Sequence, residues 1–211
     1  MSAFPHLPLG QRIPASPHAV SCSLPTMRDV RGYEEKNPET MRHLVSGYPR
    51  FVVHHFTRQL IGYFAPTVPA LADRTLWLVT SEAMARLLAA HLGGAAQGVE
   101  VFARDGLHGV SHPESAATAA RAKTLLQNIG GFLSSREAED ALVRLGLLAA
   151  PYAEATFAGD APAEIRRVLR PALPPATDAD LLLAPSGMNA IYAAFRASAE
   201  LQATRGRTVW L

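Results

Sequence analysis

Three residues near the end of the sequence have the types and spacing of an anion-binding turn. Ser186, Gly187 and Met188 follow a short apolar run at 181–184 and open an amphipathic stretch that continues to about residue 204. A strand, a tight turn and a helix in this order present the free N–H groups of the first helical turn to an anion, and the helix dipole adds to the attraction. A serine and a glycine at this place also suit a simple helix cap, so both interpretations stay open from the residues alone.

A second pair of residues suits phosphate chemistry. Arg50 offers a planar fork of donors that can bind a phosphate with two hydrogen bonds, and Tyr48 supplies a hydroxyl donor two positions earlier. Together they could neutralise a dianion that a helix N-terminus alone would hold weakly. The alternative is a surface arginine beside a half-buried tyrosine.

The other reactive side chains give weaker signals. His54 and His55 are adjacent, so their side chains diverge on a strand or a helix, and we expect no metal site there. His18 suits a structural hydrogen bond as well as a functional role. Cys22, the single cysteine, is read as a packing residue, because no activating histidine or helix terminus is visible near it.

The first part of the chain is expected to form an arm. Residues 1–32 contain five prolines and little periodicity, which predicts an extended arm lying on another part of the protein or on another subunit. A short helix is predicted over 37–45, with Pro38 at its first position. A second helix is predicted over 56–64 and should be closed by Pro66.

From residue 76 the pattern changes to alternating strands and helices. Strands are predicted at 76–80, 99–103 and 107–111, the last two joined as a hairpin through Asp105 and Gly106. Three helices are predicted between and after these strands. The first is capped by Ser81 and ends at Gly93, and the second covers Ala116–Ile129. The third runs to Leu145 after a capping box formed by Ser134 and Glu137. Further helices are predicted at Ala161–Leu169 and after Gly187, with a strand at 181–184 between them.

The fold class expected from this order is α/β, in three parts. Residues 1–66 would form the arm and its helices, 67–176 a small α/β lobe, and 177–211 the start of a further domain. The chain stops after an apolar, β-prone run at 207–211, where a strand should begin, so we expect a fragment of a longer protein.

Composition excludes several classes of function. The 20 basic residues are nearly all arginine and are scattered among 18 acidic ones, so no basic run points to nucleic acid as a partner. The sequence shows no signal peptide and no apolar run of about 18 residues, which argues against a membrane. A single cysteine excludes an internal disulfide and suits a reducing compartment, so a cytoplasmic location is expected.

Two short segments resemble a known enzyme family. The stretch LLLAPSGMNAIYAAF is similar to the "SSGMAAI" segment of the Cys/Met metabolism enzymes that depend on pyridoxal 5'-phosphate (PLP), and SGYPRFVVH resembles their "Tyr-x-Arg" motif. The resemblance implies that Ser186, Gly187 and Met188 bind the cofactor phosphate, and that Tyr48 and Arg50 reach the phosphate of a neighbouring subunit. It also implies a homo-oligomer, either a dimer or a tetramer.

Longer segments resemble one subgroup of this family. Residues 9–58, with their Pro-His-Ala-Val-Ser and Leu-Pro-Thr runs, and FLSSREAEDAL at 132–142 are similar to the larger, fungal-type cystathionine gamma-synthases. The resemblance implies a PLP fold type I domain beginning at residue 177, and replacement of the acyl group of an O-acylhomoserine by cysteine in methionine biosynthesis. An O-acylhomoserine sulfhydrylase is the nearest alternative. A non-catalytic α/β interaction module is the alternative from another class.

The lysine needed for this chemistry is missing from the segments that resemble the family. PLP enzymes hold the cofactor through a lysine whose amine forms a Schiff base. The chain has only Lys36, in a charged run, and Lys123, in a predicted helix beside Arg121. We therefore expect no catalytic residue within this chain, a Schiff-base lysine beyond Leu211, and an inactive fragment.

Overall fold

The chain forms two compact units. The computed structural model describes residues 6–44, 46–47 and 52–203. The first unit comprises Met1–Gln127 and Gly131–Tyr152, and the second comprises Asn128–Gly130 and Ala153–Leu211. Both strands and helices are present, which confirms the predicted mixed α/β class.

The first unit is built around a three-stranded antiparallel sheet. Strands β3 (Arg74–Val79), β4 (Glu100–Arg104) and β5 (Leu107–Pro113) lie in the order β3-β5-β4. Asp105 and Gly106 join β4 to β5 with φ values of 51° and 75°, the positive values that a two-residue hairpin turn requires. The predicted hairpin is confirmed.

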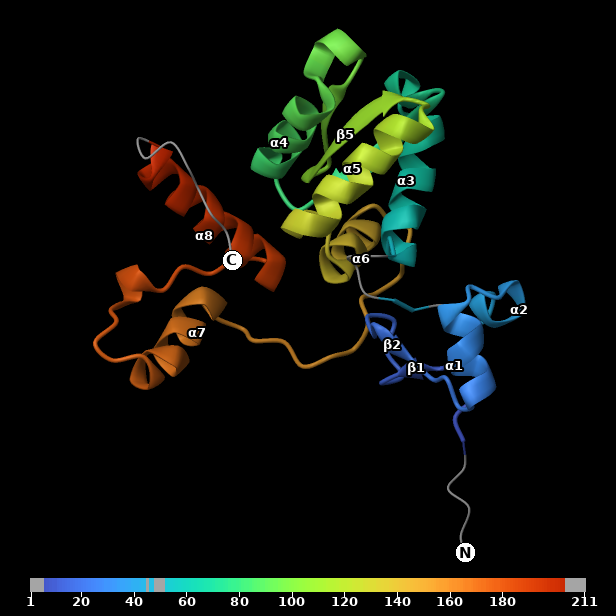
Figure 1. Cartoon of the computed structure of the whole chain (residues 1–211), viewed down its shortest axis with the longest axis horizontal. Coiled ribbons are helices and arrows are strands. Elements are labelled where there is room, and N and C mark those ends of the chain that lie inside the picture. Colours follow the sequence, from blue (N-terminus) through green and yellow to red (C-terminus); the bar gives the residue numbers. More distant parts are fainter. Residues whose placement is uncertain (1–5, 45, 48–51, 204–211) are drawn as a thin grey trace, which may run out of the picture. The chain divides into compact units, whose positions relative to one another are not determined.

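Helices cover the sheet. Helices α4 (Glu82–Leu92) and α3 (His55–Thr67) lie on opposite sides of the strands in Figure 1, and α6 (Ser135–Arg144) packs on α3. After α5 (Ala116–Ile129) the chain returns to the outer edge of β3, where Val79 forms an isolated bridge with Phe132. The resulting β-α-β-β-α-β order is that of the split β-α-β fold, with its last strand reduced to one bridge.

The main apolar core of this unit lies between the sheet and α3 with α6. Phe64 and Phe102 meet edge to face there, with ring centroids 5.2 Å apart. Alternate residues of β3 take part because successive side chains of a strand point to opposite faces. The core also includes Phe56, Leu60, Leu76, Leu78, Leu107, Leu133 and Leu142.

The predicted helix ends in this unit are confirmed. The hydroxyl of Ser81 accepts from the Met84 N–H, and Gly93 ends α4 with a φ of 101°. Ser134 and Glu137 form the predicted capping box of α6. Helix α3 continues one residue beyond Pro66 rather than ending before it.

The N-terminal segment is more regular than predicted. Two short strands, β1 (Arg12–Ile13) and β2 (Ser21–Cys22), pair with each other, and helix α1 (Met27–Glu34) follows. The prediction of an extended arm over residues 1–32 missed α1, whose only buried residue is Gly32 and which therefore shows little apolar periodicity. The helix predicted over 37–45 is shorter: α2 (Pro38–Met41) buries only Thr40, so packing does little to extend it.

The second unit contains two helices and little packing. Helices α7 (Ala161–Leu169) and α8 (Gly187–Leu201) are joined through two single 3₁₀ turns, Arg170–Ala172 and Asp178–Asp180. The strand predicted at 181–184 is wrong: in the part of the chain that the structure describes it has no partner strand, and Leu182 is 90% exposed. The run at 207–211 lies outside the described residues.

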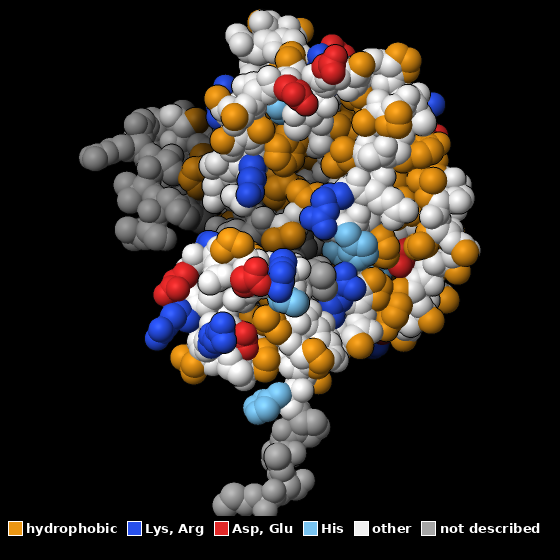
Figure 2. Space-filling model, turned by 90° about the vertical axis from the view of Figure 1, so that its right-hand side faces the viewer, with side chains coloured by type: hydrophobic (Ala, Val, Ile, Leu, Met, Phe, Trp, Pro, Cys, Tyr) orange, Lys and Arg blue, Asp and Glu red, His pale blue; other side chains and the backbone are white. Residues whose placement is uncertain are grey.

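Within residues 6–44, 46–47 and 52–203, no helix combines the length and the apolar character that crossing a membrane requires. On the face that Figure 2 shows, basic and acidic side chains lie among hydrophobic ones.

Candidate functional site

Helix α8 begins at the residues that the sequence singled out. Ser186 is the N-cap, and its hydroxyl oxygen accepts from the Asn189 N–H at 3.2 Å. Gly187 is exposed, and a side chain added to it would meet nothing within 4 Å. The N–H groups of Gly187 and Met188 belong to the first helical turn, which has no intrahelical acceptors for them. This helix end is therefore open to an anion.

A short turn of the same unit holds the helix end in place. The side-chain amide of Asn189 donates to the Ile129 carbonyl at 3.2 Å. Gly130 has a φ of +72°, and a Cβ built on it would lie 2.3 Å from the Ser186 Oγ. The turn therefore requires glycine at position 130 for two reasons: the left-handed backbone and the close Ser186 hydroxyl both disfavour a side chain there. The sequence predicts the cap at Ser186 but not this support.

The residues present fit a phosphate group in part. The N–H groups of Gly187 and Met188, one serine hydroxyl and the positive end of a 15-residue helix form a suitable set for a phosphate. Tyr48 and Arg50, the pair predicted to complete it, lie outside the described residues. The structure thus brings Ser186, Gly187 and Met188 together and leaves the arginine and tyrosine roles as predictions.

Neither lysine has the surroundings of a Schiff-base residue. Lys36 is exposed in a turn with a φ of 56°, and its Nζ lies 4.3 Å from the centre of the Tyr33 ring. Lys123 is exposed on α5. A reactive lysine needs burial or close cations to lower its pKa, and the exposure of both side chains provides no such burial.

A buried polar cluster joins the N-terminal segment to α6. His18 is 8% exposed and Glu139 is 4% exposed. The His18 Nε2 lies 3.2 Å from the Glu139 Oε2, and its Nδ1 lies 3.0 Å from the Ser135 Oγ. The other carboxylate oxygen of Glu139 accepts from the Tyr152 N–H at 3.0 Å. Both buried side chains thus have hydrogen-bond partners, as buried polar groups in proteins usually do.

The two adjacent histidines have different roles. His54 caps α3: its Nδ1 accepts from the Phe56 N–H, and its Nε2 donates to the Pro17 carbonyl at 2.8 Å. Burial lowers the pKa of His54, and the same cause lowers the pKa of His55 to about 4. In the described residues no three histidine, cysteine or acidic side chains are grouped to hold a metal. Burial also raises the pKa of the half-buried Cys22 thiol.

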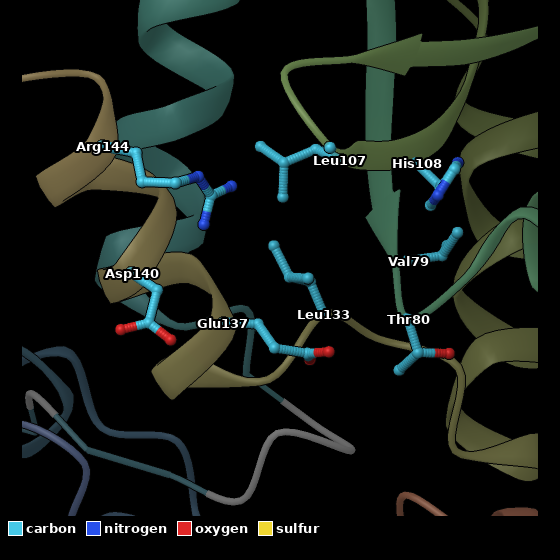
Figure 3. A pocket seen from close by; sticks show the side chains of 9 residues that line it. Val79, Thr80, Leu107, His108, Leu133, Glu137, Asp140 and Arg144 are labelled. Atoms are coloured by element: carbon cyan, nitrogen blue, oxygen red, sulfur yellow. The ribbon is translucent and has the colours of Figure 1, made fainter.

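A small polar pocket lies where α6 meets the end of the sheet. Figure 3 shows Arg144 of α6 extending toward Leu107, and Glu137 of the same helix extending past Leu133 toward Thr80. These residues, with Asp140, line a pocket of about 130 Å³. Arg144 donates to the Asp105 carbonyl at 3.1 Å, which ties α6 to the hairpin turn. Two of its charged residues thus have structural roles, since Glu137 also completes the cap of α6.

Known proteins are similar to this chain over different parts of its length. The chain is 36% identical to an L-2-amino-4-chloropent-4-enoate dechlorinase/desaturase of Streptantibioticus cattleyicolor over 199 residues, which is 94% of the chain and 39% of that protein. It is 38% identical to the cystathionine gamma-synthase of Neurospora crassa over 85 residues, 40% of the chain and 13% of that protein. A cystathionine gamma-synthase of Saccharomyces cerevisiae matches at 42% over 53 residues, 25% of the chain and 8% of that protein.

These similarities support the resemblance to cystathionine gamma-synthase-like enzymes. The chain spans 39% of the length of the bacterial relative and 13% or less of the two fungal ones. Because the bacterial relative covers nearly the whole chain, the similarity favours the broader group over its fungal-type subgroup. No family model matches the chain, and no solved structure does.

Proposed function

We propose that this chain is the N-terminal part of a PLP-dependent enzyme of the cystathionine gamma-synthase-like group, with the cofactor phosphate bound at the start of α8. One observation supports the proposal: the segment that resembles the family's phosphate motif forms a capped helix N-terminus, at which Gly187 is exposed and a Cβ on Gly187 would meet no atom within 4 Å. When bound, PLP supplies an electron sink for reactions at amino acid carbons.

Each residue has a defined role in this proposal. The Gly187 and Met188 amides and the Ser186 hydroxyl donate to phosphate oxygens. Tyr48 and Arg50 add a hydroxyl and a bidentate guanidinium from a neighbouring subunit, so the complete protein is a homodimer or a homotetramer. Residues 1–66 supply the arm, 67–176 the small lobe and 177–211 the start of the fold type I domain. The lysine that completes the site lies beyond Leu211, and the enzyme is cytoplasmic.

The proposed reaction is replacement at the γ-carbon of an O-acylhomoserine by the thiol of cysteine, in methionine biosynthesis. A sulfhydrylase that takes sulfide instead would use the same phosphate residues. A second candidate follows from the bacterial relative, whose name gives a substrate with chlorine on carbon 4. Carbon 4 is the γ-carbon, so loss of chloride there also removes a leaving group from the position attacked in the first reaction.

The phosphate site is tested on the chain itself. In a ¹⁵N-labelled sample, inorganic phosphate and PLP should both shift the Gly187 and Met188 amide resonances with saturation. The amide of Ala161 at the start of α7 is the matched control, because the N-cap there is Asp160, whose carboxylate repels an anion. Shifts of equal size at the N-termini of α7 and α8, or no shift of the Gly187 amide, would contradict the proposed site.

The enzyme class is tested on the gene extended to its next in-frame stop. Titration with PLP should give a visible absorbance band in the extended protein only, and Arg50→Ala should weaken binding, whereas Arg42→Ala should not. Arg42 is exposed and pairs with Glu39 in α2. A folded extended protein with no band would favour the non-catalytic α/β module.

A further inference from the structure

The first unit contains an apolar cavity that has no part in the proposed phosphate site. The cavity has a volume of about 230 Å³ and lies between α3 and the outer edge of β3. Its lining is mostly hydrocarbon and aromatic, as in many small-molecule sites. The residues that matter for its chemistry are Thr57, Arg58, Ile61, Leu76, Trp77 and Phe132.

Among the described residues that line this cavity, Arg58 alone is charged. Its side chain is exposed, and one of its NH₂ groups donates to the Val53 carbonyl at 3.0 Å. A guanidinium has five N–H donors, so most of them remain for a ligand at the mouth of the cavity. No carboxylate that would pair with an ammonium group lies among the described lining residues.

Thr57 adds a second, independent observation. Its side chain is 4% exposed, and its hydroxyl has no hydrogen-bond partner among the described residues. A threonine within a helix commonly bonds the carbonyl four residues earlier. Here that carbonyl belongs to Val53 and accepts from Arg58 instead. A buried hydroxyl without a partner is costly, so a polar atom of a bound molecule is expected to meet it.

We propose that this cavity binds a small monocarboxylic acid with a branched or aromatic hydrocarbon body. Arg58 pairs with the carboxylate, the Thr57 hydroxyl donates to an oxygen of the ligand, and the body lies beside Ile61, Trp77 and Phe132. The Trp77 and Phe132 ring centroids are 6.3 Å apart, so both can contact one apolar body. This site is independent of the proposed function, because it shares no residue with it.

Trp77 reports on its own cavity. The chain has two tryptophans, so Trp210→Phe leaves Trp77 as the single fluorescent one. In this background, 4-methylpentanoate and phenylacetate should change the Trp77 emission with saturation. Two probes change one feature each: 4-methylpentanamide lacks the charge, and L-leucine adds an ammonium group to the same body. Both should bind at least about tenfold more weakly, since each loses or opposes a charge-assisted contact.

Three variants decide which contacts matter. Arg58→Gln should weaken acid binding about tenfold, whereas Arg86→Gln, on an exposed arginine of α4, should leave it unchanged. Thr57→Val should weaken binding without lowering the melting temperature, because valine keeps the shape and removes the unpaired hydroxyl.

The same titrations can overturn the assignment. Absence of a saturable signal, equal binding of acid and amide, or unchanged binding by Arg58→Gln would each overturn it. Loss of the signal as protein concentration rises, together with self-association, would assign the cavity to a second copy of the chain and also overturn it.

Discussion

The imidazole Nε2 of His18 and the carboxylate Oε2 of Glu139 lie 3.2 Å apart in the interior of the first unit, although 121 positions separate them in the sequence. His18 belongs to the N-terminal segment and Glu139 to α6. The pair therefore connects the segment before α1 to α6, one of the helices that pack on the main core. Tyr152 adds to the same junction, because its N–H bonds Glu139 and its hydroxyl bonds the Ala15 carbonyl.

Removing one partner of this pair should destabilise the first unit. Glu139→Ala leaves His18 and the Tyr152 N–H without an acceptor in a buried place, so we expect a loss of about 3 kcal/mol in the free energy of unfolding. Urea denaturation followed by far-UV circular dichroism measures it. Asp140→Ala, on the exposed neighbour in the same helix, should cost far less. Equal effects of the two substitutions would show that the contact does not matter.

A double-mutant cycle separates the pair from general packing effects. If His18 and Glu139 interact directly, the cost of His18→Ala and Glu139→Ala together should be smaller than the sum of the single costs. Strict additivity would mean that each residue acts through other neighbours.

The stability of the first unit should depend on pH through His55. Burial lowers the pKa of His55 from an ordinary 6.5 to about 4. Between these values the unfolded chain takes up a proton that the folded chain does not, so the free energy of unfolding should fall as the pH drops through this window and be fully regained above it. The lowered pKa of His54 acts in the same direction.

The measurement is a set of urea denaturation curves between pH 4 and pH 7. His55→Leu should reduce the slope in this range without loss at pH 7, because the Nδ1 of His55 is buried without a partner among the described residues. An unchanged slope in the variant would assign the pH dependence to other groups.

Gly130 should be required for the structure of the α8 N-terminus. The Gly130 backbone has a φ of +72°, so Gly130→Ala should lower the free energy of unfolding by about 1–2 kcal/mol through backbone strain alone. The added Cβ would also lie 2.3 Å from the Ser186 Oγ and should displace the cap. The phosphate-induced shift of the Gly187 amide should then be lost. Gly146→Ala is the matched control, because Gly146 has a φ of +70° but no atom within 4 Å. Retention of the shift in Gly130→Ala would argue against this support.

Neither lysine of this chain should form a stoichiometric bond with PLP. Both are exposed and lack the burial that activates a Schiff-base lysine. After incubation with PLP and reduction with borohydride, mass spectrometry should show only low, scattered labelling, equal to the background in Lys36→Gln with Lys123→Gln. Complete labelling of one lysine in the unchanged chain would contradict this.

Local patterns predicted the local structure. The caps at Ser81 and Ser134, and the turn at Asp105 and Gly106, depend on hydrogen bonds between residues three or fewer positions apart, which the sequence shows directly. The strand at 181–184 was predicted from apolar character alone, but a strand also needs a partner that the pattern does not reveal. The close approach of Ser186 to Gly130 likewise joins residues that are distant in the sequence, so no local pattern shows it. The cap of the candidate site was therefore predictable and its support was not.

The second unit has a different consequence for how the chain should behave over time. Residues 153–203 include no buried side chain, while Ile191 is 53% exposed and Leu201 is 84% exposed. Helices of 9 and 15 residues are marginal in water without tertiary packing. Their amide protons should therefore exchange with solvent orders of magnitude faster than those of β5, and proteases should cleave α7 first. The helix that carries the candidate phosphate site would thus open to solvent far more often than the sheet of the first unit.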